Sequence, residues 1–145
     1  MRILITCCLA LCFTLATSTP LTAQCNFSAY QQHSASKIPE GQRLLKSFHL
    51  DGKNGEKKEV EVKVNLRKDT NYYFQLATGS DGGAEGVVAA VINNKKNEVA
   101  SSYDHTGYRE QFNYRCRASG VYTVVFTFKE TDVYCGAATV SVETE

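Results

Sequence analysis

The sequence contains no tryptophan and almost no net charge, and each absence makes some classes of ligand less favoured. With 16 basic and 15 acidic side chains, the formal charge is +1. A chain so balanced has no long-range field that would attract nucleic acid or anionic lipid. Tryptophan is the strongest aromatic platform for a sugar ring, so its absence makes glycan binding less favoured without excluding it.

Motifs for catalysis and for zinc binding are also lacking. No two of the histidines have the spacing of paired metal ligands: His33, His49 and His105. Residues 101–105 contain two serines, an aspartate and a histidine, but neighbouring residues on a strand or loop point apart, and no Gly-x-Ser-x-Gly turn exists. The glycine-rich residues 79–86 precede an apolar strand, whereas a phosphate loop precedes a helix. We therefore predict that the protein is not an enzyme.

Only the N-terminus carries a long apolar run. Arg2 precedes the apolar residues 3–16, which are too few to span a bilayer, and Leu21-Thr22-Ala23 ends a small, polar stretch. This order predicts a secretory signal peptide over residues 1–23, cut before Gln24. Cys25 lies one residue too late for a lipid anchor at that cleavage point. We expect a secreted or periplasmic chain, not inserted in a membrane after cleavage, with a single domain over residues 24–145.

Cleavage of the signal peptide leaves three of the six cysteines, which are Cys25, Cys116 and Cys135. In an oxidising compartment, three cysteines predict one disulfide and one free thiol. A full strand separates Cys116 from Cys135, and eight strand residues span roughly 25 Å, whereas bridged Cα atoms lie about 4.4–6.8 Å apart. Cys25 is therefore the favoured partner of one of the other two, and the choice between them stays open.

Period-two alternation of apolar and polar residues runs through most of the chain, with almost no amphipathic-helix signal. It predicts an antiparallel all-β domain of about eight strands, which bury themselves most easily as a jelly-roll-like β-sandwich. Leu44 and Phe48 are expected to point inward, and Phe27 and Tyr30 to pack over one end of the sandwich. The expected strands cover residues 42–50, 58–66, 72–78, 87–92, 98–103, 109–117, 121–129 and 134–142.

From residue 59 to residue 142, the chain resembles the bacterial pre-peptidase C-terminal (PPC-like) domain. The resemblance lies in the alternating valines of residues 60–66, the aromatic strand 72–76, the buried hairpin 87–102 and the Gly-x-Tyr turn at 120–122. It implies a β-sandwich, here in a standalone secreted form, and a role in binding matrix proteins or calcium. The chain departs from the family by having no protease domain and by having Glu85-Gly86 where an acidic pair is common.

Three acidic residues are candidate calcium ligands. Asp81 and Glu85 belong to the glycine-rich segment, and Asp104 lies in a later loop. Calcium takes six to eight oxygen ligands, so several loops must converge for such a site. A calcium-stabilised accessory domain is accordingly a distant alternative, and no other cofactor is predicted.

Exposed tyrosines are the favoured binding residues. Tyr73, Tyr103 and Tyr108 are expected to lie outside the core, where aromatic rings anchor protein contacts or stack on sugars. We therefore predict a secreted, non-catalytic binding module for a glycan, a matrix protein or a cell-envelope protein. The alternative is a structural or assembly protein that uses a sheet face or a sheet edge such as residues 98–103.

Overall fold

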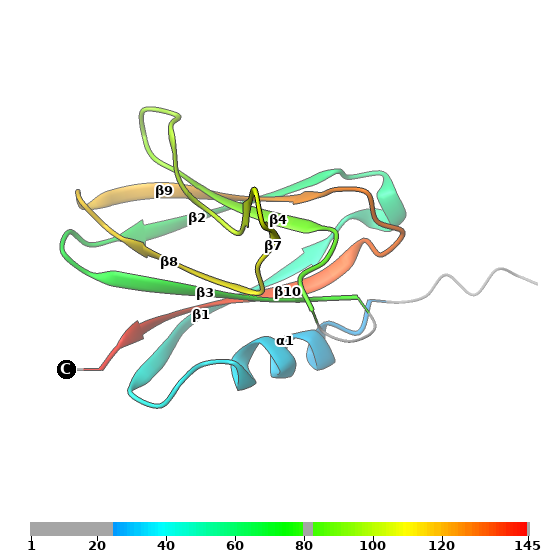
Figure 1. The fold of residues 1–145 in the computed structure, drawn as a ribbon, viewed down its shortest axis with the longest axis horizontal. Helices are drawn as coiled ribbons and strands as arrows, with labels where there is room; N and C mark the ends of the chain where they lie inside the picture. The colour runs from blue at the N-terminus through cyan, green and yellow to red at the C-terminus, as the bar shows by residue number, and fades with distance from the viewer. Residues whose placement is uncertain (1–24, 80–82, 145) are drawn as a thin grey trace, which may run out of the picture.

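The computed structural model describes residues 25–79 and 83–144, which form two stacked antiparallel sheets (Figure 1). Sheet A contains β1 (Gln42–Asp51), β10 (Cys135–Glu143), β3 (Asn71–Thr78) and β8 (Gln111–Arg115), in that order. Sheet B contains β2 (Glu59–Leu66), β9 (Gly120–Phe128), β4 (Val87–Ile92) and β5 (Glu98–Ser101). A separate hairpin pairs β6 (Tyr103–Asp104) with β7 (Gly107–Tyr108). The helices are α1 (Phe27–Ser36) and the short η1 (Lys53–Gly55).

The predicted antiparallel all-β sandwich is confirmed, with ten strands in the described residues rather than about eight. Jelly-roll connectivity is not confirmed by these strand orders. The predicted signal peptide and Gln24 lie outside the described residues. Within the part of the chain that the structure describes, no helix is long and apolar enough to cross a membrane.

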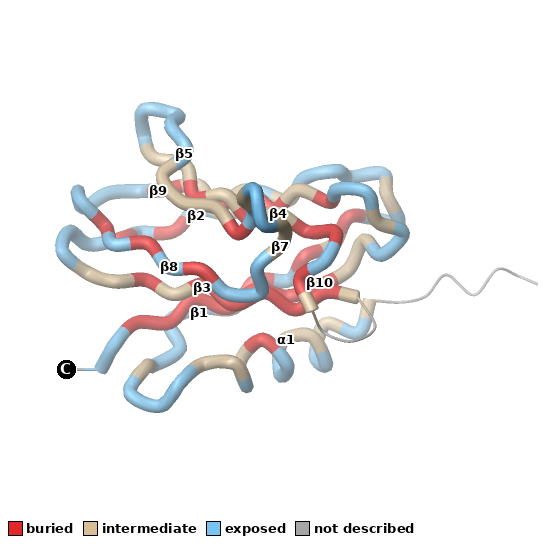
Figure 2. The backbone as a smooth tube through the Cα atoms, in the orientation of Figure 1, coloured by how far each residue is buried: buried red, intermediate tan, exposed pale blue. Residues whose placement is uncertain are grey.

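The core lies between the two sheets, and the buried residues belong mostly to their strands (Figure 2). In β9 the inward residues are Tyr122, Val124, Phe126 and Phe128, all buried. Phe126 of sheet B meets Phe48 of sheet A, with ring centroids 6.2 Å apart. In sheet A, Phe74 stacks on Phe112 of the neighbouring strand at 4.8 Å. Aromatic and β-branched side chains fill a pleated surface well, which is why these segments form strands.

Helix α1 was not predicted, and the expectation that Phe27 and Tyr30 cover one end of the sandwich is wrong. The helix lies along the outer face of sheet A and packs against β10, β3 and β1 (Figure 1). The side chain of Asn26 caps its first turn by accepting a hydrogen bond from the Ala29 N–H at 3.2 Å. Phe27 stacks on His49 of β1, with centroids 4.8 Å apart. The helix carries no apolar stripe, so period-3.6 analysis had nothing to detect.

Leu44 does not point inward as expected, because 45% of it is exposed. Strand β1 has a bulge between Leu44 and Lys46, where the register against β10 shifts by one residue. A bulge reverses which residues face the core from that point on. Phe48, beyond the bulge, is buried as expected.

A buried polar network joins sheet A to the helix above it. Gln75 donates a hydrogen bond from Nε2 to Ser141 Oγ at 3.0 Å, and its Oε1 accepts one from Thr139 Oγ1 at 3.1 Å. Thr139 Oγ1 also lies 3.3 Å from the carbonyl oxygen of Ser34 in α1. All four of these residues are completely buried. Hydrogen bonds therefore take the place of the apolar contact that usually fixes a helix on a sheet.

Replacing Gln75 by leucine is expected to lower the free energy of unfolding by about 1–3 kcal/mol, because buried hydroxyls lose their partners. Urea unfolding would measure the change. The matched control is Gln111→Leu, since Gln111 is opposite Gln75 on β8 and exposed, and its effect should stay within about 0.5 kcal/mol. Equal stability of the two variants would contradict a stabilising network.

Candidate functional site

The β6–β7 hairpin connects sheet B to sheet A and presents a well-braced turn. Asp104 pairs with Gly107 across the hairpin, and Gly107 has a φ of 113°, which favours glycine. The Asp104 carboxylate accepts hydrogen bonds from the Thr106 N–H at 2.8 Å and the Thr106 hydroxyl at 2.5 Å. It also forms an ion pair with Arg109 at 2.7 Å. The hydrogen bonds from Thr106 are the main reason that the pKa of Asp104 is lowered, with smaller help from Arg109.

Tyr103 and Tyr108 face each other across this hairpin and pack edge to face. Their ring centroids lie 5.1 Å apart at an interplanar angle of 64°. Lys129, which follows β9, places its Nζ 4.5 Å from the centroid of Tyr103. The Tyr108 hydroxyl donates to the carbonyl oxygen of Lys129 at 3.3 Å. We call Tyr103, Tyr108 and Lys129 the tyrosine cluster.

The two tyrosines differ in exposure and in environment. Tyr103 is 39% exposed and available for contact. Tyr108 is half-buried, and burial followed by the nearby charge of Glu130 raises its pKa. It therefore stays a neutral hydroxyl, able to donate, across the physiological pH range.

Gly86 fixes the position of Lys129 from the far side. The Lys129 N–H donates to the Gly86 carbonyl oxygen at 2.8 Å. Gly86 has a φ of +80°, and a Cβ there would lie 2.5 Å from Cβ of Thr131. Only glycine fits this position, so backbone conformation and packing explain one of the glycines in the glycine-rich segment 79–86.

An open hollow of about 310 Å³ lies beside the tyrosine cluster. Two carboxylates border it, those of Glu85 and Glu110, and Glu110 also forms an ion pair with Lys37 at 2.8 Å. A neighbouring hollow of about 350 Å³ adds the acidic residues Glu130 and Asp132. The tyrosine cluster thus presents two aromatic rings and one lysine next to an acidic surface. The hollows are lined by Gly83, Ala84, Glu85, Tyr108 and Glu110, and by Thr78, Gly79, Glu85, Gly86, Glu130, Thr131, Asp132 and Val133.

Tyr73, the third predicted binding residue, does not belong to this cluster. It lies on the outer side of β3, beside Ser141 of β10 and Asn113 of β8. Its hydroxyl donates a hydrogen bond to the carboxylate of Glu143, which raises the pKa of Tyr73. The structure therefore brings together two of the three predicted tyrosines.

Two of the three candidate calcium ligands, Glu85 and Asp104, lie within the described residues. Asp81 lies outside the described residues. Glu85 is exposed at the acidic hollow, whereas the Asp104 carboxylate is engaged by Thr106 and Arg109. Within residues 25–79 and 83–144, no group of three or more His, Cys, Asp or Glu side chains is arranged to hold a metal ion. Calcium binding stays a prediction that these residues alone do not test.

The serines and the histidine near Asp104 are not arranged as a catalytic triad. Ser102 is buried, and its hydroxyl accepts a hydrogen bond from the Ala89 N–H at 2.8 Å. Ser101 Oγ accepts one from the Tyr103 N–H at 3.1 Å. Both hydroxyls thus hold backbone N–H groups, Ser101 at the start of the hairpin and Ser102 on the neighbouring strand β4.

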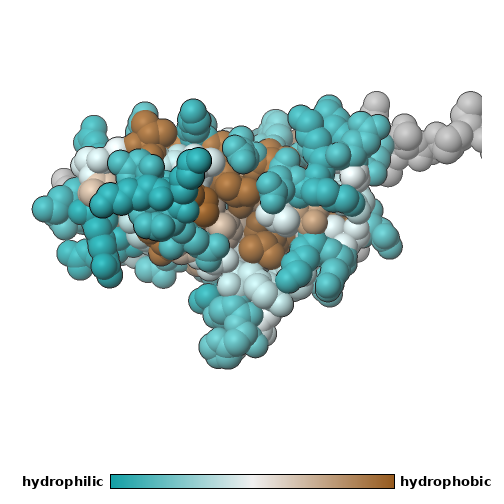
Figure 3. Space-filling view, turned by 90° about the horizontal axis from the view of Figure 1, so that it is seen from above, coloured by the Kyte–Doolittle hydropathy of each residue, from teal (hydrophilic) through white to brown (hydrophobic). Residues whose placement is uncertain are grey.

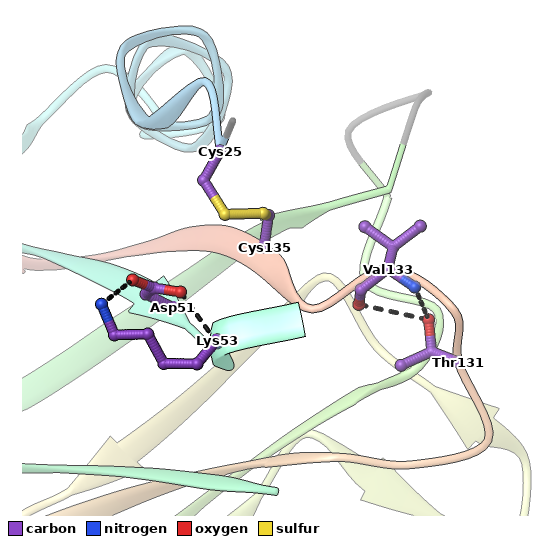
Figure 4. Close-up of a disulfide and its surroundings, with 6 residues drawn as sticks. All are labelled: Cys25, Asp51, Lys53, Thr131, Val133 and Cys135. Atoms are coloured by element: carbon purple, nitrogen blue, oxygen red, sulfur yellow. Dashed lines mark hydrogen bonds and ion pairs between the residues drawn. A yellow bond between two sulfur atoms is a disulfide. The ribbon is translucent and has the colours of Figure 1, made fainter. Parts of the chain in front are cut away.

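A disulfide joins Cys25, directly before α1, to Cys135, the first residue of β10 (Figure 4). The prediction that Cys25 is bonded is confirmed, and the partner that the sequence left open is Cys135. Cys116 is a buried free thiol, which donates to the carbonyl oxygen of Ala118 at 3.1 Å. Its burial makes it an inert core residue rather than a reactive one.

A groove of about 760 Å³, which no sequence pattern indicated, lies where β1, the β2–β3 turn and the end of β10 meet. Two arginines, Arg43 and Arg67, line it together with Leu45 and Tyr72. No local pattern could indicate it, because its residues come from three separate segments, 43–45, 65–72 and 142–144. It is lined by Arg43, Leu45, Asn65, Arg67, Thr70, Tyr72, Val142, Glu143 and Thr144.

Comparison with known proteins finds similarity only among solved structures. No protein-family model matches the chain, and no curated protein matches it. A solved structure that resembles it is PliG from Aeromonas hydrophila, a periplasmic lysozyme inhibitor of g-type lysozyme. The two share 12% identity at a TM-score of 0.44, over 75% of this chain and 92% of PliG. A likeness this weak supports no conclusion about function, and the resemblance to the pre-peptidase C-terminal domain stays a prediction.

Proposed function

We propose that this chain is a secreted or periplasmic, non-catalytic module that binds a protein partner through the tyrosine cluster. The observation that carries the proposal is the Tyr103–Tyr108 pair, displayed on a hairpin that Asp104 holds in shape. Rigid, partly exposed tyrosines lose little conformational entropy on binding and are common energetic centres of protein interfaces.

A protein partner fits the cluster better than a glycan does. A sugar ring needs an open aromatic face to stack on. The Nζ of Lys129 lies over the ring of Tyr103, and Tyr108 meets Tyr103 edge to face. The acidic residues Glu85 and Glu110 next to the cluster supply a charged rim, as protein interfaces commonly have.

The proposed compartment rests on covalent chemistry. The Cys25–Cys135 disulfide is typical of oxidising compartments outside the cytosol. The apolar N-terminal residues 3–16, followed by Leu21-Thr22-Ala23, support export through a signal peptide. Both features support a secreted or periplasmic protein.

A specific observation also favours the alternative of an assembly protein. Strand β5 lies at one edge of sheet B, where it pairs with β4 alone. An edge strand offers unpaired backbone groups to another strand. Strand β5 contains only four residues, however, and short edge strands limit such pairing.

Changing both Tyr103 and Tyr108 to alanine is expected to weaken binding of the partner at least about 30-fold, equivalent to about 2 kcal/mol. The mature chain would be immobilised and exposed to envelope and culture extracts of its producing organism, with and without a calcium chelator. Proteins retained by the unchanged chain and lost by the variant would be identified, and their affinities measured by calorimetry.

The matched control is Tyr73→Ala, which removes a partly exposed tyrosine away from the cluster and should leave retention unchanged. Retention of the same proteins by the double variant would refute the proposed site. Retention of polysaccharide instead of protein would favour the glycan alternative, and loss only in chelator would favour calcium binding.

A further inference from the structure

The two outer faces of the sandwich are covered differently. On sheet A, α1 packs over β10, β3 and β1. On sheet B, no described helix covers the outer face, which is the side seen from above in Figure 3. Apolar side chains gather in the middle of that view and hydrophilic ones surround them.

Register across sheet B identifies the apolar residues of this face. On β4 they are Val88, Ala90 and Ile92, which alternate with the inward Val87, Ala89 and Val91. Val125 of β9 pairs with Ala90, while Thr127 and Thr123 pair with Val88 and Ile92. Val121, the second residue of β9, is 51% exposed. We call Val88, Ala90, Ile92, Val121 and Val125 the open face.

Charges of opposite sign lie at two diagonally opposite corners of the open face. Glu59 and Glu61 of the outer strand β2 pair with Thr127 and Val125 of β9, at one end of the sheet. Lys95 and Lys96 lie in the β4–β5 turn, beyond Ile92. This turn is at the opposite end of the strands from Glu59 and on the β4–β5 side of the sheet, away from β2. These four charged residues are exposed, and none is in an ion pair within the described chain. Lys63 lies on the same face next to the acidic corner, and Glu98 lies on it next to the two lysines, so the net charge is −1 at one corner and +1 at the other.

The β4–β5 turn also rises above the outer side of sheet B. In Figures 1 and 2 it is the loop at the upper left that stands clear of the β9 and β2 layer. Its backbone is braced by Asn93, whose side chain accepts hydrogen bonds from the N–H groups of Lys95 at 2.9 Å and Asn97 at 3.0 Å. Lys95 and Lys96 are therefore held where they can reach over a molecule lying on the open face.

We propose that the open face binds a second copy of this chain in a two-fold symmetric dimer. A two-fold axis in the plane of the interface, perpendicular to the diagonal, places the Glu59–Glu61 corner of each copy against the Lys95–Lys96 turn of the other. One apolar patch with opposite charges at opposite corners is complementary to itself, which a two-fold interface requires. The open face is separate from the tyrosine cluster, so dimerisation and partner binding are independent proposals.

Sedimentation equilibrium of the purified mature chain over a range of concentrations tests the dimer. The unchanged chain should show a reversible monomer–dimer equilibrium. Reversing either corner, with Glu59→Lys/Glu61→Lys or with Lys95→Glu/Lys96→Glu, should weaken self-association about tenfold or more, because like charges then meet. These surface changes leave the core untouched, and circular dichroism would verify that each variant folds.

Mixing the two reversed variants is the decisive measurement. In the mixed dimer, the basic corner of one variant meets the acidic turn of the other, and its basic turn meets the partner's acidic corner. The mixture should therefore dimerise as well as the unchanged chain, although each variant alone does not. A control charge reversal on β8 of sheet A, Arg115→Glu, should leave the equilibrium unchanged.

Three results would overturn the proposal. One is an unchanged chain that stays monomeric at the highest concentration at which it remains soluble. Another is a mixture that associates no better than its components. The third is a control reversal that weakens the dimer as much as the corner reversals do.

Discussion

Replacing both Cys25 and Cys135 by serine is expected to lower the free energy of unfolding by about 3–5 kcal/mol. The bonded cysteines are 110 residues apart, so the disulfide closes most of the mature chain into one loop. Without it the unfolded chain gains conformational entropy, and the gain grows slowly with loop length. A small domain is stable by about 5–15 kcal/mol in total, so the loss is a large fraction of its stability.

Loss of the disulfide should lower local stability most in α1. The helix has no apolar stripe, and Cys25, just before the N-cap residue Asn26, is its covalent anchor. Beyond that anchor it depends on the buried hydrogen bond to Ser34 and on Lys37, which donates to the carbonyl oxygen of Leu76 at 2.9 Å. Amide hydrogen exchange in α1 should therefore accelerate in the serine variant more than exchange in β9.

Urea unfolding with and without a reducing agent separates the disulfide from side-chain effects of the substitutions. The unchanged chain in reductant should become about as unstable as the serine variant. The serine variant itself should not respond to reductant, because the remaining Cys116 is a buried thiol. If reduction leaves the unchanged chain at full stability, loop closure by this disulfide does not stabilise the fold.

The strands of the sandwich could be predicted because each has two chemically different faces. In β2 the valines at positions 60, 62 and 64 alternate with charged residues, and in β9 the aromatic residues alternate with threonine and valine. This alternation needs no knowledge of distant partners. The exception is Leu44, where one extra residue in β1 reversed the expected direction, and a bulge leaves no sequence signal of its own.

The helix and the disulfide partner could not be predicted, because neither leaves a local pattern in the sequence. Residues 27–36 bury a serine rather than an apolar row, so no hydrophobic periodicity indicated a helix there. Since the position of Cys25 depends on where α1 docks on sheet A, the choice between Cys116 and Cys135 was undetermined. Burial of Cys116 among core aromatics, near the hydroxyl of Tyr122, settles the choice.

The candidate site was predicted only as far as its tyrosines. The short segment between Tyr103 and Tyr108, with Gly107 before the second tyrosine, predicts neighbouring rings once a hairpin is recognised. Lys129 follows 21 residues after Tyr108 in the sequence, and its contact with Tyr103 depends on how β9 ends beside the hairpin. Such contacts between separate segments carry no local pattern.

Phe126→Ala is expected to lower the free energy of unfolding by about 3–5 kcal/mol, since a fully buried phenylalanine leaves a cavity that the core refills only in part. Phe126 is central to the sandwich because β9 pairs with a strand on each side of it and the Phe126 ring meets Phe48 of the other sheet. The midpoint of urea unfolding should fall while its slope stays constant, which indicates a change in stability alone.

Thr127→Ala is the matched control, because Thr127 is the next residue of the same strand and points to the outer face of sheet B. Its effect should stay below about 1 kcal/mol, so the ratio of the two effects measures how strongly the sandwich separates its inner and outer faces. The β6–β7 hairpin links β5 of sheet B to β8 of sheet A, so a weaker contact between the sheets should also loosen the tyrosine cluster. If Phe126→Ala and Thr127→Ala destabilise the chain equally, β9 does not hold the core between the sheets, and the geometry that displays Tyr103 and Tyr108 loses its physical basis.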